Sequence, residues 1–436
     1  MQAVNVRPQL KTVLLALTLG VAIGLPLHLS AAETEETVVT EKSLPLDELR
    51  LFTEVFQRIK SSYVEPVDDA ELLENALRGM IAGLDPHSAY LEADEFEDLQ
   101  AHTSGEFGGL GIEVGLEDGF IRVITPIDDT PAQRAGVKAG DLITKLGDQA
   151  VQGMDLSRAI GLMRGKPGSK LILTIVREGE EKPLEIEVVR DIIQVASVKS
   201  RMLDDHYAYL RVTQFQVDTG KELNKHLKKL QKNALKGAVL DLRNNPGGVL
   251  QAAVDVSDAF ISDGLVVYTQ GRITEADQKF SATKKTQAPE LPLVVLINGG
   301  SASASEIVAG ALQDSKRAII MGLDSFGKGS VQTVLPLTKE RALKLTTARY
   351  FTPGGRSIQA QGIIPDMEVP QANLVIQDTG FIVKEADLSG HIANGLGGED
   401  RNSLDAENSF DDIAKNDFQL FQALSVLKAF PKLVPQ

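Results

Sequence analysis

The chain of 436 residues contains no cysteine and only six histidines. The absence of cysteine excludes disulfides, thiolate zinc sites and a cysteine nucleophile, so the function does not depend on thiol redox chemistry. The H-E-x-x-H pattern of zinc peptidases is absent as well, and the acidic residues are scattered over predicted helix faces. We therefore expect neither a metal nor a cofactor.

The chain also lacks an excess of positive charge, since its formal net charge is −15. Binding to nucleic-acid phosphates depends on clustered Lys and Arg, so a broad nucleic-acid surface is excluded, although a local basic groove is not. Hydrophobic residues make up 43% and charged residues 24% of the chain, as in ordinary globular proteins. The length is sufficient for two or three hydrophobic cores.

The first 32 residues have the three parts of a secretory signal. Arg7 and Lys11 precede an apolar run over residues 13–25, and small residues follow at 30–32. We expect cleavage after Ala32; the alternative is an uncleaved anchor, because the run is only just short of a membrane span. Either way the rest of the chain is exported, which in a cysteine-free protein indicates a bacterial periplasm. Membrane contact is expected only through an uncleaved signal segment.

Changes in periodicity divide the rest of the chain. Apolar residues at three- and four-residue steps predict helices, whereas period two with turn residues predicts strands. Alternating strands and helices predict an α/β core with largely parallel strands, whose sites gather beyond the carboxyl ends of the strands. We thus predict a multidomain α/β protein. Its parts are a linker at 33–45, a helical domain at 46–102, a β-rich domain at 103–193, an α/β core at 194–368 and a C-terminal extension at 369–436. The extension contains an acidic linker and a docking helix.

The strongest local signal is the segment NGGSASASE at 298–306, between a predicted buried strand and a predicted helix. Its small residues allow a sharp turn and the close approach of a substrate. A serine there has its hydroxyl at a helix amino end, where free N–H groups and the helix dipole can stabilise an oxyanion. Ser303 and Glu306 also fit a capping box, and this stretch alone favours that simpler interpretation.

A second segment with the same placement shifts the balance toward a reaction site. Residues 244–248 read NNPGG and follow the predicted strand at 238–242. The N–H groups of Gly247 and Gly248 could hold a developing negative oxygen. Because both segments follow strands, we expect them on the same rim of the sheet.

A nucleophilic serine needs a base, and histidine is the usual one. No histidine lies in a strand-end turn of the predicted core; His206 and His226 are expected at the surface. That leaves Lys328, which lies between glycines after a predicted strand at 318–321. A lysine base must be neutral, which requires lowering its pKa by roughly 3 units at a cost of about 4 kcal/mol, so it needs a desolvated pocket. Gln332, four residues on, is expected to reach back by one helical turn to orient the amine.

Lys328 has two other possible interpretations. Residues 322–328 match the phosphate-loop pattern G-x-x-x-x-G-K, but Gly329 stands where such loops need Ser or Thr to hold magnesium. An exported protein would also lack a nucleotide supply, so this interpretation is set aside. The other is an ordinary surface lysine on a turn.

Five segments, taken in order, resemble the motifs of the carboxyl-terminal processing peptidases, also called tail-specific proteases. They read GLDPHS at 83–88, GGLGI at 108–112, DLRNNPGG at 241–248, SASASE at 301–306 and FGKGSVQ at 326–332. The resemblance runs from about residue 46 to residue 366 and implies an α/β serine-peptidase core with a Ser–Lys dyad. The family nucleophile is the middle serine of SASAS, here Ser303, with its lysine at Lys328 and a supporting glutamine at Gln332.

The resemblance also implies that the β-rich segment is a PDZ domain, inserted between the helical domain and the core. Its carboxylate-binding loop would be Gly108, Gly109, Leu110, Gly111 and Ile112. The N–H groups of such a loop hold a terminal carboxylate while the peptide adds a strand to the sheet. Arg164 resembles the PDZ arginine that contacts the active-site glutamine when the enzyme is switched on.

Family members assemble through their helical ends, and bacterial members often trim envelope proteins or peptidoglycan hydrolases with the help of an adaptor. The resemblance therefore implies a homo-oligomer, substrates bound by their C-terminal ends, and an adaptor protein as a further partner. The tail after Asp366 resembles the family least, which leaves the assembly and the adaptor open.

Two hypotheses follow. In the first, an exported serine endopeptidase uses Ser303 to attack the peptide carbonyl, Lys328 takes the serine proton, and the N–H groups of Ala304 and of Gly247 or Gly248 hold the oxyanion. Its substrates would be exported or envelope proteins recognised by their C-terminal ends. In the second, the chain is a non-catalytic PDZ-type scaffold that only binds peptide tails.

Overall fold

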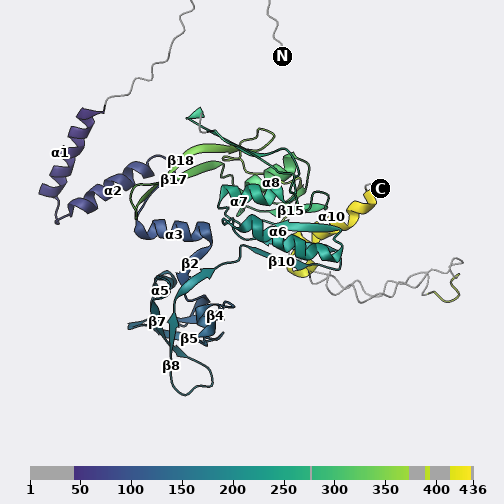
Figure 1. Cartoon of the computed structure of the whole chain (residues 1–436), viewed down its shortest axis with the longest axis horizontal. Helices are drawn as coiled ribbons and strands as arrows, with labels where there is room; N and C mark the ends of the chain where they lie inside the picture. Colours follow the sequence, from purple (N-terminus) through teal and green to yellow (C-terminus); the bar gives the residue numbers. More distant parts are fainter. Residues whose placement is uncertain (1–43, 275–276, 373–387, 393–412, 434–436) are drawn as a thin grey trace, which may run out of the picture. The chain divides into compact units, whose positions relative to one another are not determined.

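The computed structural model describes residues 44–274, 277–372, 388–392 and 413–433 (Figure 1). The predicted signal segment, nearly all of the linker behind it and the acidic stretch of the tail lie outside these residues. The chain divides into two compact units, residues 1–72 and 73–436. Within the described ranges, no helix is both long enough and apolar enough to cross a bilayer.

The described part of the first unit is helical. Helix α1 (Leu46–Ser62) carries Asp47 and Glu48 in its first turn, where negative charge stabilises a helix amino end. Helix α2 (Asp69–Ala82) begins in this unit and continues into the second. The helical region predicted from the apolar spacing is therefore confirmed. No residue of α1 is buried, and its Phe52 is 47% exposed.

Strand β1 (Ala89–Leu91) and helix α3 (Ala93–Ser104) lie between α2 and the β-rich domain. Helix α3 begins with a capping box, in which the Glu95 carboxylate accepts a hydrogen bond from the N–H of Glu92 at 3.0 Å. Strand β1 was not expected within the helical segment. Its partner is strand β18 (Ala342–Phe351), far along the chain, and pairing of this kind leaves no local periodicity.

The β-rich domain has the antiparallel strands that its period-two pattern predicted. One sheet has the order β3-β4-β5-β7-β8 with β6 beside β5, and β2 pairs separately with β9. Leu110, Ile121, Ile143, Leu173 and Ile175 are buried in its core. Its elements are β2 (Glu106–Gly109), β3 (Ile112–Glu117), β4 (Phe120–Pro126), α4 (Pro131–Arg134), β5 (Leu142–Leu146), β6 (Gln149–Ala150), α5 (Leu156–Met163), β7 (Lys170–Val176), β8 (Leu184–Val189) and β9 (Asp191–Gln194).

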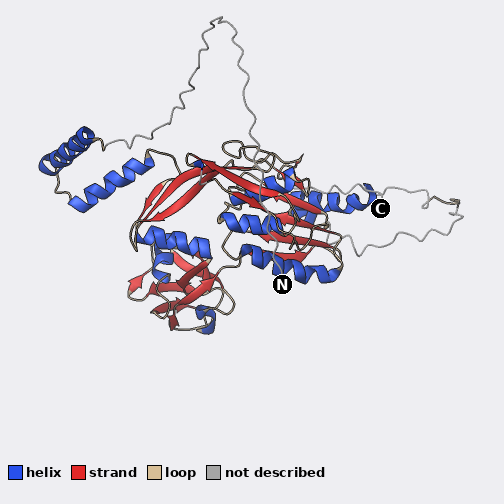
Figure 2. Ribbon diagram, turned by 45° about the horizontal axis from the view of Figure 1, so that its top comes forward, coloured by secondary structure: helices blue, strands red, loops and turns tan. Residues whose placement is uncertain are grey.

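The α/β core is built on a six-stranded sheet with the order β10-β11-β12-β15-β16-β19 (Figure 2). All neighbours are parallel except β10 and β11, as the alternation of strands and helices predicted. Its elements are β10 (Val198–Met202), β11 (Tyr207–Val212), α6 (Thr219–Leu230), β12 (Gly237–Asp241), α7 (Leu250–Asp258), β15 (Leu293–Ile297), α8 (Ala304–Asp314), β16 (Ile319–Gly322), β19 (Met367–Glu368) and α10 (Phe418–Leu433).

Alternate residues of the parallel strands pack into two different hydrophobic cores, one on each face of the sheet. In β12, Ala238 and Leu240 pack with residues of helices α6, α7 and α8. Val239 between them faces the other way, toward Leu424 and Leu427 of α10. The sheet is therefore covered on both faces, which explains why its strands are continuous apolar runs in the sequence.

A second, antiparallel sheet adjoins the core and has the order β1-β18-β13-β14. Its further strands are β13 (Leu265–Gly271) and β14 (Lys279–Ser281), and β17 (Ser330–Pro336) pairs with the opposite edge of β18. None of β13, β17 and β18 was predicted from the sequence. Their half-exposed residues mix apolar and polar types, so period two is weak.

Candidate active site

The loops that follow β12 and β15 lie side by side at the carboxyl ends of these parallel neighbours. The Asn298 amide donates to Asn244 Oδ1 at 2.9 Å, and the N–H of Asn244 donates to Asn298 Oδ1 at 2.8 Å. The N–H of Ala302 donates to the carbonyl of Asn245 at 3.0 Å. The expectation that the two glycine-containing segments share one rim of the sheet is thus confirmed.

Ser303 occupies a strained turn between β15 and α8. Its backbone angles are φ 53° and ψ −110°, a region that residues with a side chain rarely adopt, and it is 8% exposed. Strain of this kind costs about 1–3 kcal/mol and clusters at functional sites. The predicted capping box is present as well, because the N–H of Ser303 donates to Glu306 Oε2 at 2.7 Å. Ser303 is therefore both the cap of helix α8 and a residue in a strained conformation, so the capping interpretation does not exclude a reaction site.

The three serines of the segment differ in the hydrogen bonds that their hydroxyl groups donate. Ser301 Oγ donates to the carbonyl of Leu242 at 2.8 Å, and Ser305 Oγ donates to the carbonyl of Asn245 at 2.9 Å; both serines are fully buried. Within the described part of the chain, the Ser303 hydroxyl donates no hydrogen bond. Ser303 is the serine whose proton remains uncommitted.

Gly247 approaches the Ser303 turn so closely that only glycine fits. A Cβ atom at Gly247 would lie 2.8 Å from Cβ of Ser303 and 2.9 Å from the backbone nitrogen of Ala304, and the φ angle of 101° disfavours any side chain. The N–H of Gly247 is already used, because it donates to Asn245 Oδ1 at 2.9 Å. The N–H groups of Gly248 and Ala304 form no hydrogen bond among the described residues.

Lys328 lies in the loop after β16 and is half-buried. Burial lowers the pKa of its amine most, and the charge of Lys344 lowers it further, whereas Asp85 and Glu306 act in the opposite direction. The amine is thus partly desolvated, unlike that of an ordinary surface lysine. No hydrogen bond joins Lys328 Nζ to the Ser303 hydroxyl anywhere in the described structure.

Glu306 connects the serine loop to the lysine loop, a role that the sequence analysis missed. Its fully buried carboxylate accepts hydrogen bonds from the N–H groups of Ser303 at 2.7 Å, Gly327 at 2.6 Å and Lys328 at 2.9 Å. It also accepts one from Ser325 Oγ at 2.6 Å. The only signal in the sequence was the capping box, which accounts for one of these four bonds.

Gln332 does not have the predicted geometry. It lies in strand β17, where residues four apart are about 13 Å from each other, so it cannot reach back by one helical turn. Its Nε2 atom donates to Ser330 Oγ at 3.0 Å and to Thr346 Oγ1 at 3.2 Å. The helical expectation was wrong because glycine, lysine and serine at 327–330 gave no sign of a strand.

The histidines lie only partly as expected. His206 and His226 are half-buried rather than solvated, and His226 Nδ1 lies 2.7 Å from Ser200 Oγ. His206 lies in the hairpin loop between β10 and β11, and His226 lies in α6, so neither lies in a loop after a parallel strand of the core. His87, in contrast, lies close enough to Lys328 for the two charges to interact: burial lowers the pKa of His87 most, and the charge of Lys328 lowers it further.

A buried ionic cluster supports the loop that contains Gly247. The Arg243 guanidinium lies between two carboxylates, 2.6 Å from Asp241 and 2.7 Å from Asp417, the residue before α10. Burial alone would raise the pKa of Asp241, but Arg243 and Arg211 outweigh it and hold that pKa below its ordinary value. The C-terminal segment is thereby joined to the end of β12.

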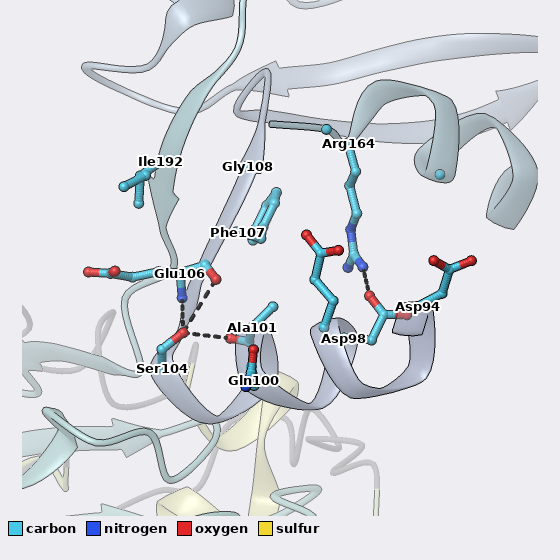
Figure 3. A pocket seen from close by; sticks show the side chains of 13 residues that line it. Asp94, Asp98, Gln100, Ala101, Ser104, Glu106, Phe107, Gly108, Arg164 and Ile192 are labelled. Atoms are coloured by element: carbon cyan, nitrogen blue, oxygen red, sulfur yellow. Dashed lines mark hydrogen bonds and ion pairs between the residues drawn. The ribbon is translucent and has the colours of Figure 1, made fainter. Parts of the chain in front are cut away.

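Arg164 lies in a cavity of about 610 Å³ between α3 and the β-rich domain, shown in Figure 3. Its guanidinium forms an ion pair with Asp98 of α3 and lies over the Phe107 ring, 5.3 Å from the ring centre. Asp94 and Glu97 also line this cavity. The structure therefore places Arg164 against α3 and does not bring it to Gln332.

The segment Gly108 to Ile112 comprises the end of β2, the connection at Leu110 and Gly111, and the first residue of β3. Leu110 is 2% exposed, and Gly111 has a φ angle of 78°. A Cβ atom at Gly111 would lie 2.3 Å from Cβ of Thr130, whose hydroxyl donates to the Gly111 carbonyl at 2.9 Å. Glycine is thus required where the chain turns from one strand to the next.

Three known families match parts of the chain. Residues 206–369 match peptidase family S41, residues 108–188 match the PDZ domain, and residues 27–95 match the activating protease CtpB N-terminal domain. A carboxy-terminal-processing protease of Bartonella bacilliformis is 48% identical over 387 residues, which are 87% of this chain and 88% of that protein. The chain belongs to the carboxy-terminal processing proteases of peptidase family S41.

Other members of the family are similar over most of the chain. Carboxy-terminal processing protease CtpA of Bacillus subtilis is 36% identical over 77% of this chain and 73% of its own length. The carboxyl-terminal-processing protease of Synechocystis is 33% identical over 82% of this chain and 87% of its own. As a carboxy-terminal processing protease, this chain is a serine peptidase with an N-terminal helical region, a PDZ domain and an S41 core. Catalysis replaces the scaffold hypothesis, and the PDZ domain implies peptide binding.

Proposed function

We propose that this protease is an endopeptidase with a Ser303–Lys328 dyad, which cleaves exported or envelope proteins held by their C-terminal ends in the PDZ domain. The observation that carries the dyad is the Glu306 carboxylate, which accepts hydrogen bonds from the N–H groups of both residues at 2.7 and 2.9 Å. One buried side chain thereby holds the backbones of nucleophile and base together.

The reaction begins with the neutral Lys328 amine. The amine takes the proton of the Ser303 hydroxyl while Oγ attacks the peptide carbonyl carbon, and the carbonyl electron pair moves to oxygen. The resulting ammonium gives its proton to the leaving nitrogen as the C–N bond breaks. Water then loses a proton to the amine and attacks the acyl-serine ester carbon. As the bond from that carbon to Oγ breaks, the ammonium returns the proton to Oγ, which releases the new carboxyl terminus and restores the serine hydroxyl and the neutral amine.

The N–H groups of Gly248 and Ala304 are the proposed donors to the oxyanion. Both are uncommitted within the described structure, whereas the N–H of Gly247 already donates to Asn245 at 2.9 Å. We therefore assign Gly247 the role of allowing the close approach to Ser303, and Gly248 the role of donor. Ala304 adds the amino end of α8, whose dipole favours negative charge.

Substrate capture is assigned to residues 108–112, at the junction of β2 and β3. Its N–H groups would hold the terminal carboxylate, and the tail would add a strand beside β3. Arg164 would leave Asp98 for Gln332 when a peptide binds, which would couple capture to catalysis. The ion pair with Asp98 supports this as the arrangement without peptide.

The remaining features follow from the sequence. The segment up to Ala32 would direct export to the periplasm and be removed, with membrane association if it is retained. Helix α1, none of whose residues is buried, offers a face for assembly of a homo-oligomer. An adaptor protein is a further expected partner.

The dyad is tested by Ser303→Ala and Lys328→Met, each purified and given an unfolded protein with a free C-terminal end. Both changes should abolish cleavage, measured by mass spectrometry of the products, while the thermal unfolding midpoint stays near that of the parent. Lys339→Met, at an exposed lysine, is the matched control and should cleave normally. Cleavage that survives in the Ser303 variant would refute the proposal.

A further inference from the structure

The turn at residues 83–88 lies next to the active-site strands, although no predicted catalytic residue is near it in the sequence. Strand β1 follows the turn directly and pairs with β18, with Ala89 opposite Lys344. The N–H of Thr346 in β18 donates to Ser88 Oγ at 3.0 Å. The pairing thus holds the turn against the strand that also pairs with Gln332.

Asp85 is the acceptor at the centre of this turn. Its carboxylate accepts from the N–H groups of His87 at 2.8 Å and Ser88 at 3.0 Å, and from Ser88 Oγ at 2.7 Å. It also accepts from Thr346 Oγ1 at 3.1 Å. The hydrogen bond from the Ser88 hydroxyl, aided by the two backbone groups, lowers the pKa of Asp85, so the carboxylate is charged at neutral pH.

Thr346 transmits the position of this carboxylate to Gln332. A threonine hydroxyl has one proton, and here the proton is directed to Asp85. Toward Gln332 the same oxygen can therefore only accept, which requires that the NH2 group of the amide faces it, at 3.2 Å. The amide oxygen is left on the other side, and no hydrogen bond reaches it within the described structure.

We propose that Asp85 is a positioning residue of the active site, which fixes the orientation of the Gln332 amide through Thr346 and places a negative charge near Lys328. The inference rests on the proposed dyad with Gln332 as its supporting residue. It gives a function to the GLDPHS segment, which the dyad and the oxyanion donors leave without one.

The charged groups that face Lys328 determine what the loss of Asp85 would do. They are Lys344 on β18, Asp85 and His87 in the turn, and Glu306 on α8. The Asp85 charge favours the protonated amine, so Asp85→Asn lowers the pKa of Lys328. The amine is then neutral at lower pH, and the acid limb of kcat/KM moves to lower pH. At the same time the asparagine NH2 can face Thr346, which frees the Gln332 amide to flip.

Two variants separate orientation from charge. Asp85→Asn should lower kcat about 10- to 100-fold, as expected for a misplaced active-site group, with KM within about twofold of the parent. Thr346→Val should lower kcat similarly but leave the acid limb in place, because the Asp85 charge remains. Thr346→Ser keeps the hydroxyl and should restore kcat. The matched control is Thr347→Val, whose hydroxyl lies 2.7 Å from that of Thr333, and it should cleave normally.

A measurement without substrate keeps this inference distinguishable from the proposed function. In protein with ¹³C-labelled lysine, the Lys328 signal is assigned by its loss in Lys328→Arg and titrated by NMR. Asp85→Asn should titrate at lower pH than the parent, and Thr346→Val at the same pH. The inference is overturned if the Lys328 titration is unchanged in Asp85→Asn. It is also overturned if kcat stays within twofold of the parent in either variant, or if Thr346→Ser does not restore activity. Cleavage that survives in Ser303→Ala would instead overturn the dyad.

Discussion

The two halves of the candidate active site are built in different ways. The nucleophile half consists of loops after adjacent parallel strands, where Ser301, Ser305 and Glu306 are fully buried and each is hydrogen-bonded. The base half combines the half-buried Lys328 with the β17–β18 hairpin and with a turn more than two hundred residues earlier in the chain. The nucleophile half is thus set by the folding of the core, whereas the base half depends on contacts between distant segments.

This difference indicates where activity can be adjusted. Changing the nucleophile half requires moving packed strand ends, which destabilises the core. Changing the base half requires only a shift of half-exposed side chains around Lys328 and Gln332. We therefore expect changes that move the packed strand ends of the first half to affect both stability and rate, unlike removal of the reacting Ser303 hydroxyl alone. Changes in the second half should affect mainly the rate and its pH dependence.

The largest effect is expected at Glu306, where the two halves meet. Glu306→Gln replaces a fully buried carboxylate that accepts four hydrogen bonds, and its NH2 group would face N–H donors. The loss should lower the free energy of unfolding by about 2–5 kcal/mol and kcat by more than about 100-fold. Denaturant unfolding and single-turnover cleavage measure the two. Glu290→Gln, at an exposed glutamate, is the control. A wild-type kcat in Glu306→Gln would show that the arrangement of the two halves of the active site does not depend on this carboxylate.

Gly247→Ala tests the nucleophile half alone and should have the next largest effect. The new Cβ would meet Ser303 Cβ at 2.8 Å in a backbone conformation that favours glycine. We expect a loss of about 1–3 kcal/mol in stability and a fall in kcat of about 100-fold, because the serine turn must shift. Gly299→Ala in the neighbouring loop has no atom within 4 Å of its new Cβ and is the matched control. Equal behaviour of the two variants would contradict the close approach.

The same contrast explains what could be predicted from the sequence. The segments at 244–248 and 298–306 are contiguous, follow apolar runs and contain small residues, so their placement on one rim followed from strand order alone. The position of Gln332 depends on the pairing of β17 with β18, and that of Asp85 on the pairing of β1 with β18. Such pairings join residues far apart in the sequence and leave little local pattern. Glu306 was visible only as a helix cap, since its bonds to Gly327 and Lys328 form in the folded core.

The smallest effect is expected at Lys344, which acts on the base half through charge alone. Its positive charge lowers the pKa of Lys328, so Lys344→Met raises that pKa. The amine then becomes neutral only at higher pH, and the acid limb of kcat/KM moves upward, opposite to the shift for Asp85→Asn. Because the charges are partly solvated, we expect a reduction of about two- to fivefold at pH 7, with no change in the high-pH plateau.

The comparison with Asp85→Asn makes this small effect informative. Both variants remove one charge near the same amine, so a general loss of stability would shift both pH profiles in the same direction or in neither. The acid limbs of the two variants are measured side by side from about pH 5 to pH 10. If they move in opposite directions, the group that titrates must be affected by both the negative charge of Asp85 and the positive charge of Lys344. Parallel shifts would mean that the acid limb does not report Lys328. They would not point to His87 either, because Asp85 raises and Lys344 lowers the pKa of His87 as well, so the base would have to be a group that these two charges do not affect.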